Sequence, residues 1–376
     1  MIMNNSVKIK RILKSKYWIS IITMAIVAVV LNLLALSREF CDWYANNVFW
    51  LWSETVSRVN GIFSFSVGEV LIILLIVFVL AFLVSAIVRI FVRKKQGYKK
   101  YFRIMAKTAL VLLMLIILLM TLNCSILYNC SRLKTGSKTA SEYTVLEIEK
   151  MRNHIVQKCN ELSVKMDRDE DSNVIFNGDY HEEIVNAMHK IANEYPRMSG
   201  YYPVLKPLWG SFFMYQSGTI GIYFPFSMEA NYCKYLSSLY RASVGCHEYS
   251  HLKGYIYEDE ANYIAFLACI NSDSEFMQYA GYISVLFYVD NDYYDLVGEE
   301  RYNRQIAISD VVYYDDACYT PEIREELEGM ESIIDNEFMR EIDDTFTKGY
   351  LDYYGATANY NEVTLLMLGY YEGKLY

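Results

Sequence analysis

Three long apolar stretches in the first third of this 376-residue chain constrain its fold more than any other feature. They run from about Trp18 to Leu36, from about Val70 to Val92 and from about Ala106 to Leu127. Each is long enough to cross the hydrocarbon core of a bilayer, which takes about 20 residues of helix. We therefore expect residues 1–129 to form a membrane anchor with three transmembrane helices in contact with a lipid bilayer.

Basic residues beside these stretches predict their orientation, because cytoplasmic loops carry an excess of lysine and arginine. The loop between the first two stretches has only Arg38 and Arg58. The N-terminus and the loop between the second and third stretches are richer, with Lys8, Lys10, Arg11, Lys14, Lys16, Arg93, Lys94, Lys95, Lys99, Lys100 and Arg103. We expect a multi-pass protein of the cell membrane, with its N-terminus in the cytoplasm and residues 130–376 outside.

The first apolar stretch has a second interpretation. Ala35-Leu36-Ser37 resembles a signal-peptidase site, so a cleaved signal peptide is the alternative. The apolar run is long for a signal sequence, which favours an anchor.

Aromatic residues crowd the loop between the first two stretches, from Phe40 to Ser66. Such side chains favour the interface between membrane and water, so an interfacial helix is one prediction. Packing of this loop against the outer domain is the alternative. The residues concerned are Trp43, Tyr44, Phe49, Trp50, Trp52, Phe63 and Phe65.

Charge divides the chain at the same place as hydropathy. Residues 1–129 hold 15 basic and 4 acidic residues, a net of +11, which leaves 20 basic and 40 acidic residues, a net of −20, in residues 130–376. A domain with that charge repels phosphates, so we expect no nucleic-acid partner. The eight cysteines contain no CxxC pair and form no dense framework, which argues against a disulfide scaffold or a cysteine-rich zinc site.

Residues 130–376 read as an α+β domain, mostly helical with a small sheet. A β-branched and aromatic run between glycine and proline predicts a strand over 218–226. Apolar spacing predicts helices elsewhere, and one or two of them should cover 229–253. The other expected helices span about 141–166, 182–194, 258–270, 274–290, 303–313, 321–345 and 360–371.

The segment HEYSH, residues 247–251, carries the clearest chemistry. On a helix, His247 and His251 lie one turn apart on one face, where both can bind a single Zn²⁺ ion. Glu248 can reach a metal-bound water and act as general base. The alternative is a helix with two hydrogen-bonded histidines and no metal.

A catalytic zinc needs a third protein ligand and an open fourth position. Glu258 and Asn262 share a helical face, so Glu258 can be the ligand while Asn262 hydrogen-bonds a ligand histidine. Glu260 is the second choice, because it points about 160° away from Asn262 on an ideal helix. These acids could also simply complement the dipole at a helix N-terminus.

The predicted strand fits a peptidase as well. An extended substrate could pair with the main chain of Gly221, Ile222 and Tyr223 beside the metal helix. An ordinary core strand is the alternative.

Several segments resemble a family of bacterial membrane proteins known as domain of unknown function 3810. The strongest is the His–Glu block, CHEYSHLKGYIYEDEANYIAFLAC at 246–269, and the resemblance touches most of the chain. The other segments are FSFSVGEVL (63–71), GIYFPFSMEANY (221–232), QYAGYI (278–283) and, more loosely, YLDYYGATANYNEV (350–363).

More remotely, the block is similar to zincin metallopeptidases of the gluzincin type. That similarity implies Glu258 as the third ligand and Asn262 as its supporting residue. Only six residues separate His251 from Glu258, fewer than is usual in gluzincins, which leaves Glu260 open as the ligand. Tyr257 stands where metzincins carry a third histidine, so that group does not match.

The function expected from these features is zinc-dependent hydrolysis of a peptide or protein substrate outside the cytoplasmic membrane, with Glu248 as general base. Two alternatives stay open at this stage. One is a binding or sensor protein that keeps a zincin fold without activity, and the other is an amidase acting on cell-wall peptides.

Overall fold

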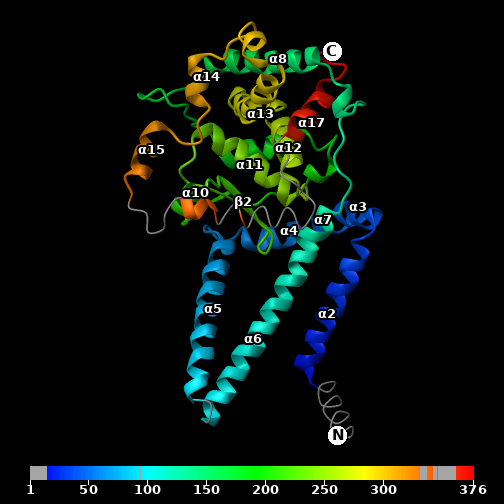
Figure 1. Ribbon diagram of the computed structural model, residues 1–376, viewed down its shortest axis with the longest axis vertical. Coiled ribbons are helices and arrows are strands. Elements are labelled where there is room, and N and C mark those ends of the chain that lie inside the picture. The colour runs from blue at the N-terminus through cyan, green and yellow to red at the C-terminus, as the bar shows by residue number, and fades with distance from the viewer. Residues whose placement is uncertain (1–14, 93–94, 331–336, 342–344, 346–360) are drawn as a thin grey trace. The chain divides into compact units, whose positions relative to one another are not determined.

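The computed structural model describes residues 15–92, 95–330, 337–341, 345 and 361–376 (Figure 1). The chain forms two compact units. The first unit contains the residues up to Phe49, Val67–Cys130 and Pro225–Ser227, and the second contains Trp50–Ser66, Ser131–Phe224 and Met228 onward. Several predicted features lie outside the described residues, namely Lys8, Lys10, Arg11, Lys14, Arg93, Lys94, parts of the helix predicted over 321–345 and most of segment 350–363.

The first unit contains three helices long and apolar enough to cross a membrane, as predicted. They are α2 (Lys16–Leu34), α5 (Val67–Val92) and α6 (Gln96–Met120), and α6 continues through a π-helical turn, Thr121–Ser125, into α7 (Ile126–Tyr128). Helix α6 packs against both α2 and α5 (Figure 1). The Asn32 amide donates to the Thr121 hydroxyl at 3.0 Å, so a polar pair joins α2 to the π-helical turn.

The aromatic loop forms two helices, α3 (Arg38–Asn47) and α4 (Phe49–Asn60). Most of α4 belongs to the second unit, where its polar groups have protein partners. Glu54 accepts from the main chain of Tyr201 at 3.0 Å, and Lys206 donates to the Asn60 carbonyl at 2.8 Å. Residues 50–66 therefore pack against the rest of the second unit, which is the alternative given above to an interfacial helix.

The second unit is mostly helical, as predicted. Side chains cap several of its helices; for example, Thr144 and Glu147 form a capping box at the start of α8. Helix α11 lies at the centre, packed against the sheet and against α12 and α13. Besides α4, its helices include α8 (Val145–Ser163), α9 (Tyr180–Lys190), α10 (Ser211–Ser217), α11 (Ser238–Leu252), α12 (Glu258–Ile270), α13 (Glu275–Tyr302), α14 (Asp310–Asp315), α15 (Pro321–Glu328) and α17 (Asn361–Tyr371).

The small sheet has three strands, β1 (Lys206–Pro207), β2 (Gly221–Phe224) and β3 (Glu229–Tyr232), in the order β1-β3-β2. Strand β1 runs parallel to β3, and β2 runs antiparallel to it. The register pairs the first residue of β2, Gly221, with the last residue of β3, Tyr232. Strand β2, which lies inside the predicted strand, is therefore at one edge of the described sheet.

Several helix predictions are wrong in part; for example, the first part of the helix predicted over 321–345 ends at Glu328 as α15. Residues 229–232 form β3, and the helix predicted over 229–253 begins only at Ser238, because Met228 turns the chain back with a φ of 52° and Glu229 forms a buried ion pair with Lys206. The helix predicted over 303–313 shortens to α14, whose start is set by the Ser309 side chain capping Val312.

Candidate metal centre

Helix α11 presents His247 and His251 one turn apart, with their ring centres separated by 4.6 Å. The opposite side of the helix is buried through Cys246, Tyr249 and Leu252. Burial of that side fixes the rotation of α11, so both imidazoles must project from its other face.

A tight turn then returns the chain to these rings. Gly254 follows the end of α11 with a φ of 88°, a conformation that glycine adopts without the steric penalty of a side chain. The turn places the Tyr255 carbonyl 2.8 Å from Nδ1 of His251, which donates to it. This hydrogen bond holds a proton on Nδ1, so Nε2 is the nitrogen of His251 that faces a metal.

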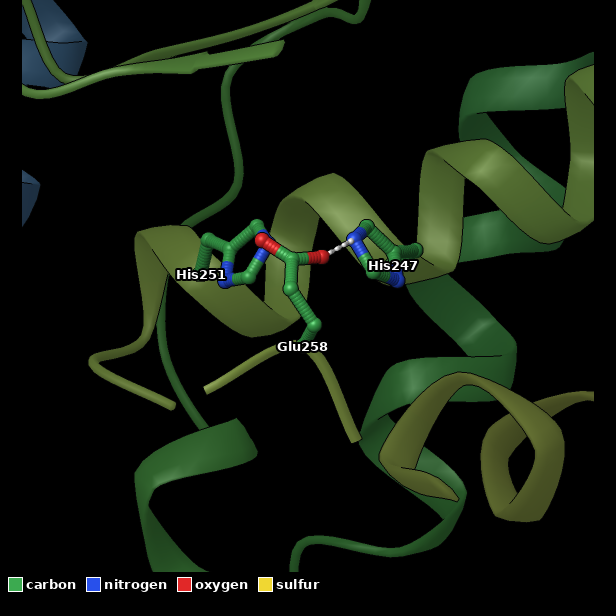
Figure 2. Close-up of side chains that lie close together, drawn as sticks. All are labelled: His247, His251 and Glu258. Atoms are coloured by element: carbon green, nitrogen blue, oxygen red, sulfur yellow. Dashed lines mark ion pairs between the residues drawn. The ribbon is translucent and has the colours of Figure 1, made fainter. Parts of the chain in front are cut away.

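Helix α12 begins at Glu258, and its carboxylate meets both histidines (Figure 2). One oxygen lies 3.2 Å from Nε2 of His247, and the other lies 3.6 Å from Nε2 of His251. One ligand atom from each of the three residues lies within 4.8 Å of the others, close enough for the three groups to hold a single metal ion. They form the one group of this kind in the described part of the chain.

Solvent can reach this site from one side. The Glu258 side chain keeps 42% of its surface exposed and His247 keeps 17%, whereas His251 keeps 8%. A metal held here would have a side open to water or to a substrate, as catalytic zinc requires.

The structure separates the two glutamates that the sequence left as alternatives. Glu260 is buried and points to the start of the segment after Ser131, where it accepts from the Leu133 main chain at 2.7 Å and forms an ion pair with Arg132 Nε at 3.1 Å. Asp259 also pairs with Arg132. Glu258 is thus the glutamate that the fold brings to the histidines.

Asn262, predicted to support a ligand histidine, lies one turn after Glu258 on α12 and is half-buried. Within the described residues its amide makes no hydrogen bond with either histidine. The supporting contact comes instead from the Tyr255 carbonyl. Sequence patterns could not reveal it, because a main-chain acceptor has no residue signature.

Charges within the site shift the pKa values of its carboxylates in opposite directions. Burial acts to raise the pKa of Glu258, but His251 and His247 hold it well below its ordinary value through charge and hydrogen bonds. Burial raises the pKa of Glu248 to about 7, although both histidines and a main-chain hydrogen bond from Tyr223 act to lower it.

Glu248 has the environment expected of a general base. Its side chain is buried, and its Oε2 atom has no hydrogen-bond partner in the described structure. Strand β2 lies directly against it: a β-carbon on Gly221 would be 2.3 Å from Glu248 Oε1 and 2.6 Å from Val244 Cγ1. Glycine at 221 therefore allows the base to lie against the edge strand.

The residues predicted to bind substrate lie on this strand. Gly221 faces Glu248, Ile222 is 38% exposed, and the Tyr223 ring is buried with its hydroxyl 3.0 Å from the Met228 sulfur. The structure thus brings together the candidate base, the three candidate ligands and the edge strand.

Comparison with known protein families matches residues 44–368 to the family described as Protein of unknown function (DUF3810). Neither the curated proteins nor the solved structures contain a match to this chain.

Proposed function

The chain belongs to the DUF3810 family, and we propose that it is a membrane-anchored zinc peptidase whose active site is the candidate metal centre. One observation carries the proposal. The Nε2 atoms of His247 and His251 converge on the Glu258 carboxylate, while the buried Glu248 lies beside an edge strand.

Each side chain has a distinct role in this proposal. His247, His251 and Glu258 hold the ion, which when bound supplies an activated water and polarises the substrate carbonyl. Glu248 accepts a proton from the attacking water and later delivers it to the departing amine. Its raised pKa, about 7, suits both transfers near neutral pH.

The substrate is an extended peptide that pairs with β2. An edge strand can bind a peptide through main-chain hydrogen bonds, which are largely independent of side-chain sequence. Gly221 and Tyr223 contact Glu248, so the scissile bond would lie opposite this part of β2.

The reaction takes place outside the cytoplasmic membrane in this proposal. The support is the distribution of basic residues, which are dense before α2 and between α5 and α6 and sparse between α2 and α5. Three spans would then leave the second unit's main segment, from Ser131 onward, on the outer side.

A degradation assay with a mixed peptide library tests the proposal. Purified full-length chain with zinc should cleave a subset of peptides, detected by mass spectrometry as new termini. Glu248→Gln should keep its zinc and lose activity by about 100- to 10,000-fold, the usual contribution of a general base. Glu300→Gln, at a side chain 87% exposed, is the matched control and should cleave at the wild-type rate.

Two further arms of this assay separate the alternatives. Cell-wall stem peptides, added to the library, report an amidase. Intact cells producing the chain should cleave a membrane-impermeant peptide in the medium, and Glu248→Gln cells should not. A zinc-loaded wild-type chain that cleaves nothing in any arm would favour a binding or sensor role and contradict the proposal.

A further inference from the structure

Arg241 is a half-buried cation on the metal helix, seven residues before Glu248. Seven residues make almost two turns of an α-helix, so Arg241 and Glu248 share one face and are separated by about 10 Å along the axis. The sheet confirms that Arg241 faces the strands. Its guanidinium lies 4.9 Å from the ring centre of Tyr232, whose strand partner is Gly221, the glycine that contacts Glu248.

No carboxylate pairs with Arg241 among the described residues, although the second unit is rich in acids. A second ring, that of Tyr180, lies 4.0 Å from its guanidinium carbon, and its buried Nε has no hydrogen-bond acceptor. Three other arginines of this unit, Arg132, Arg152 and Arg168, pair with aspartates.

A guanidinium that has no carboxylate partner favours an anionic ligand with two oxygen acceptors. It carries five N–H donors in a planar fork, and burying them without acceptors costs free energy. Two aromatic rings can stabilise the positive charge over the guanidinium faces, but they supply no acceptor to the buried Nε. A carboxylate matches that fork with two parallel hydrogen bonds.

The position of Arg241 indicates where on a peptide bound to β2 the carboxylate would lie. An extended peptide rises about 3.3 Å per residue, so about three of its residues span the roughly 10 Å by which Arg241 and Glu248 are separated along α11. Arg241 lies near the Gly221 end of β2, because its neighbour Tyr232 pairs with Gly221.

We propose that Arg241 forms a carboxylate-binding subsite beside the metal centre, which selects peptides with a negative charge about three residues from the cleaved bond. The carboxylate is either the C-terminus of the peptide or an aspartate or glutamate side chain. The selection of substrates rests on the proposed peptidase function, whereas the binding of a carboxylate does not.

Binding of three peptide probes, which differ in where they carry a carboxylate, to the full-length chain tests the inference. One probe ends in a free carboxylate, the second is amidated and carries glutamate, and the third is amidated and carries glutamine. Each is made as a hydroxamate, which also binds zinc, and as an acetylated peptide without a metal-binding group. Fluorescence anisotropy of labelled probes gives the affinities.

The wild type should bind at least one anionic probe about 10- to 100-fold more tightly than the neutral one, as charged hydrogen bonds allow. Arg241→Gln should lose this preference and keep its affinity for the neutral probe. Arg241→Lys keeps the charge without the planar fork, so it should keep only part of the preference for anionic probes. This variant replaces Arg241→Gln in the test if Arg241→Gln unfolds at a clearly lower temperature than the wild type. Arg304→Gln, exposed and paired with Glu300, should match the wild type.

Equal affinity of the wild type for anionic and neutral acetylated probes would overturn the inference, as would a preference that survives in Arg241→Gln. Failure of the proposed function gives a different result. The hydroxamate probes then bind no more tightly than the acetylated probes, while the wild type still binds the anionic probes more tightly than the neutral one. The arm that shows the preference identifies a C-terminal or a side-chain carboxylate.

Discussion

At the scale of single residues, the choice of third ligand depends on one arginine. Glu258 and Glu260 are two positions apart on α12, and sequence spacing alone leaves both open. Arg132 and the Leu133 main chain bind Glu260, which leaves Glu258 to face the histidines. The arginine lies 126 positions before Glu258 in the sequence, so no local pattern could have decided between the two.

Zinc binding should release a proton from His251. In the metal-free chain burial acts to lower the pKa of His251, but the charge of Glu258 and a hydrogen bond to it raise that pKa to about 9. Because a metal needs the neutral ring, binding below pH 9 displaces one proton, and affinity should rise up to about tenfold per pH unit toward that value.

Titration calorimetry in buffers of different ionisation enthalpy measures this release. At pH 7.5 we expect about one proton per zinc ion. His189→Gln, on the exposed side of α9, should release the same number. An affinity independent of pH between 6.5 and 8.5 would contradict this account of His251.

At the scale of secondary structure, the contact between β2 and α11 places the candidate base. Gly221→Ala puts a methyl group 2.3 Å from Glu248 Oε1, well inside the van der Waals distance. The carboxylate must shift, and a displacement of about 1 Å in a catalytic group costs about 100-fold in rate.

We expect Gly221→Ala to lose about 100-fold in the rate of hydrolysis and to keep the zinc content per chain unchanged. Gly97→Ala, where a β-carbon meets nothing within 4 Å, is the control, and equal rates for the two variants would count against the placement.

Local signals predicted some elements well and failed where distant residues decide. Helix α12 occupies the predicted range, Glu258–Ile270, because its acids and apolar spacing lie within the segment itself. Strand β3 was missed, because Glu229 and Ala230 suit a helix and only pairing with β2 and the distant Lys206 makes them a strand.

At the scale of the whole molecule, residues 50–66 of the loop between α2 and α5 are part of the unit that carries the site. Lys253, just after α11, is buried and lies 3.7 Å from Glu54 of α4, and Lys206 donates to the Asn60 carbonyl. Burial lowers the pKa of Lys253 to about 8, although Glu54 acts to raise it. Hydropathy and charge place a boundary near residue 129, and the aromatic residues of the loop left packing against the outer domain open beside an interfacial helix, because contacts distant in the sequence decide between the two.

The fragment 130–376 should therefore be unstable by itself. Without residues 50–66, Lys253 loses a carboxylate and Lys206 loses an acceptor, and loss of one partner from a buried pair costs about 3–5 kcal/mol. We expect a fragment that joins 50–66 to 130–376 through a flexible linker to melt at a clearly higher temperature by circular dichroism. Equal melting temperatures for the two fragments would show that α4 is dispensable.

The metal content of the full-length chain tests the central claim most directly. Zinc per chain, measured by mass spectrometry of the purified protein, should be close to one for the wild type and for Glu260→Gln, whose carboxylate faces Arg132. His251→Ala and Glu258→Gln should lose most of it. A wild type without zinc after loading, or a loss with Glu260→Gln but not with Glu258→Gln, would contradict the metal centre described here.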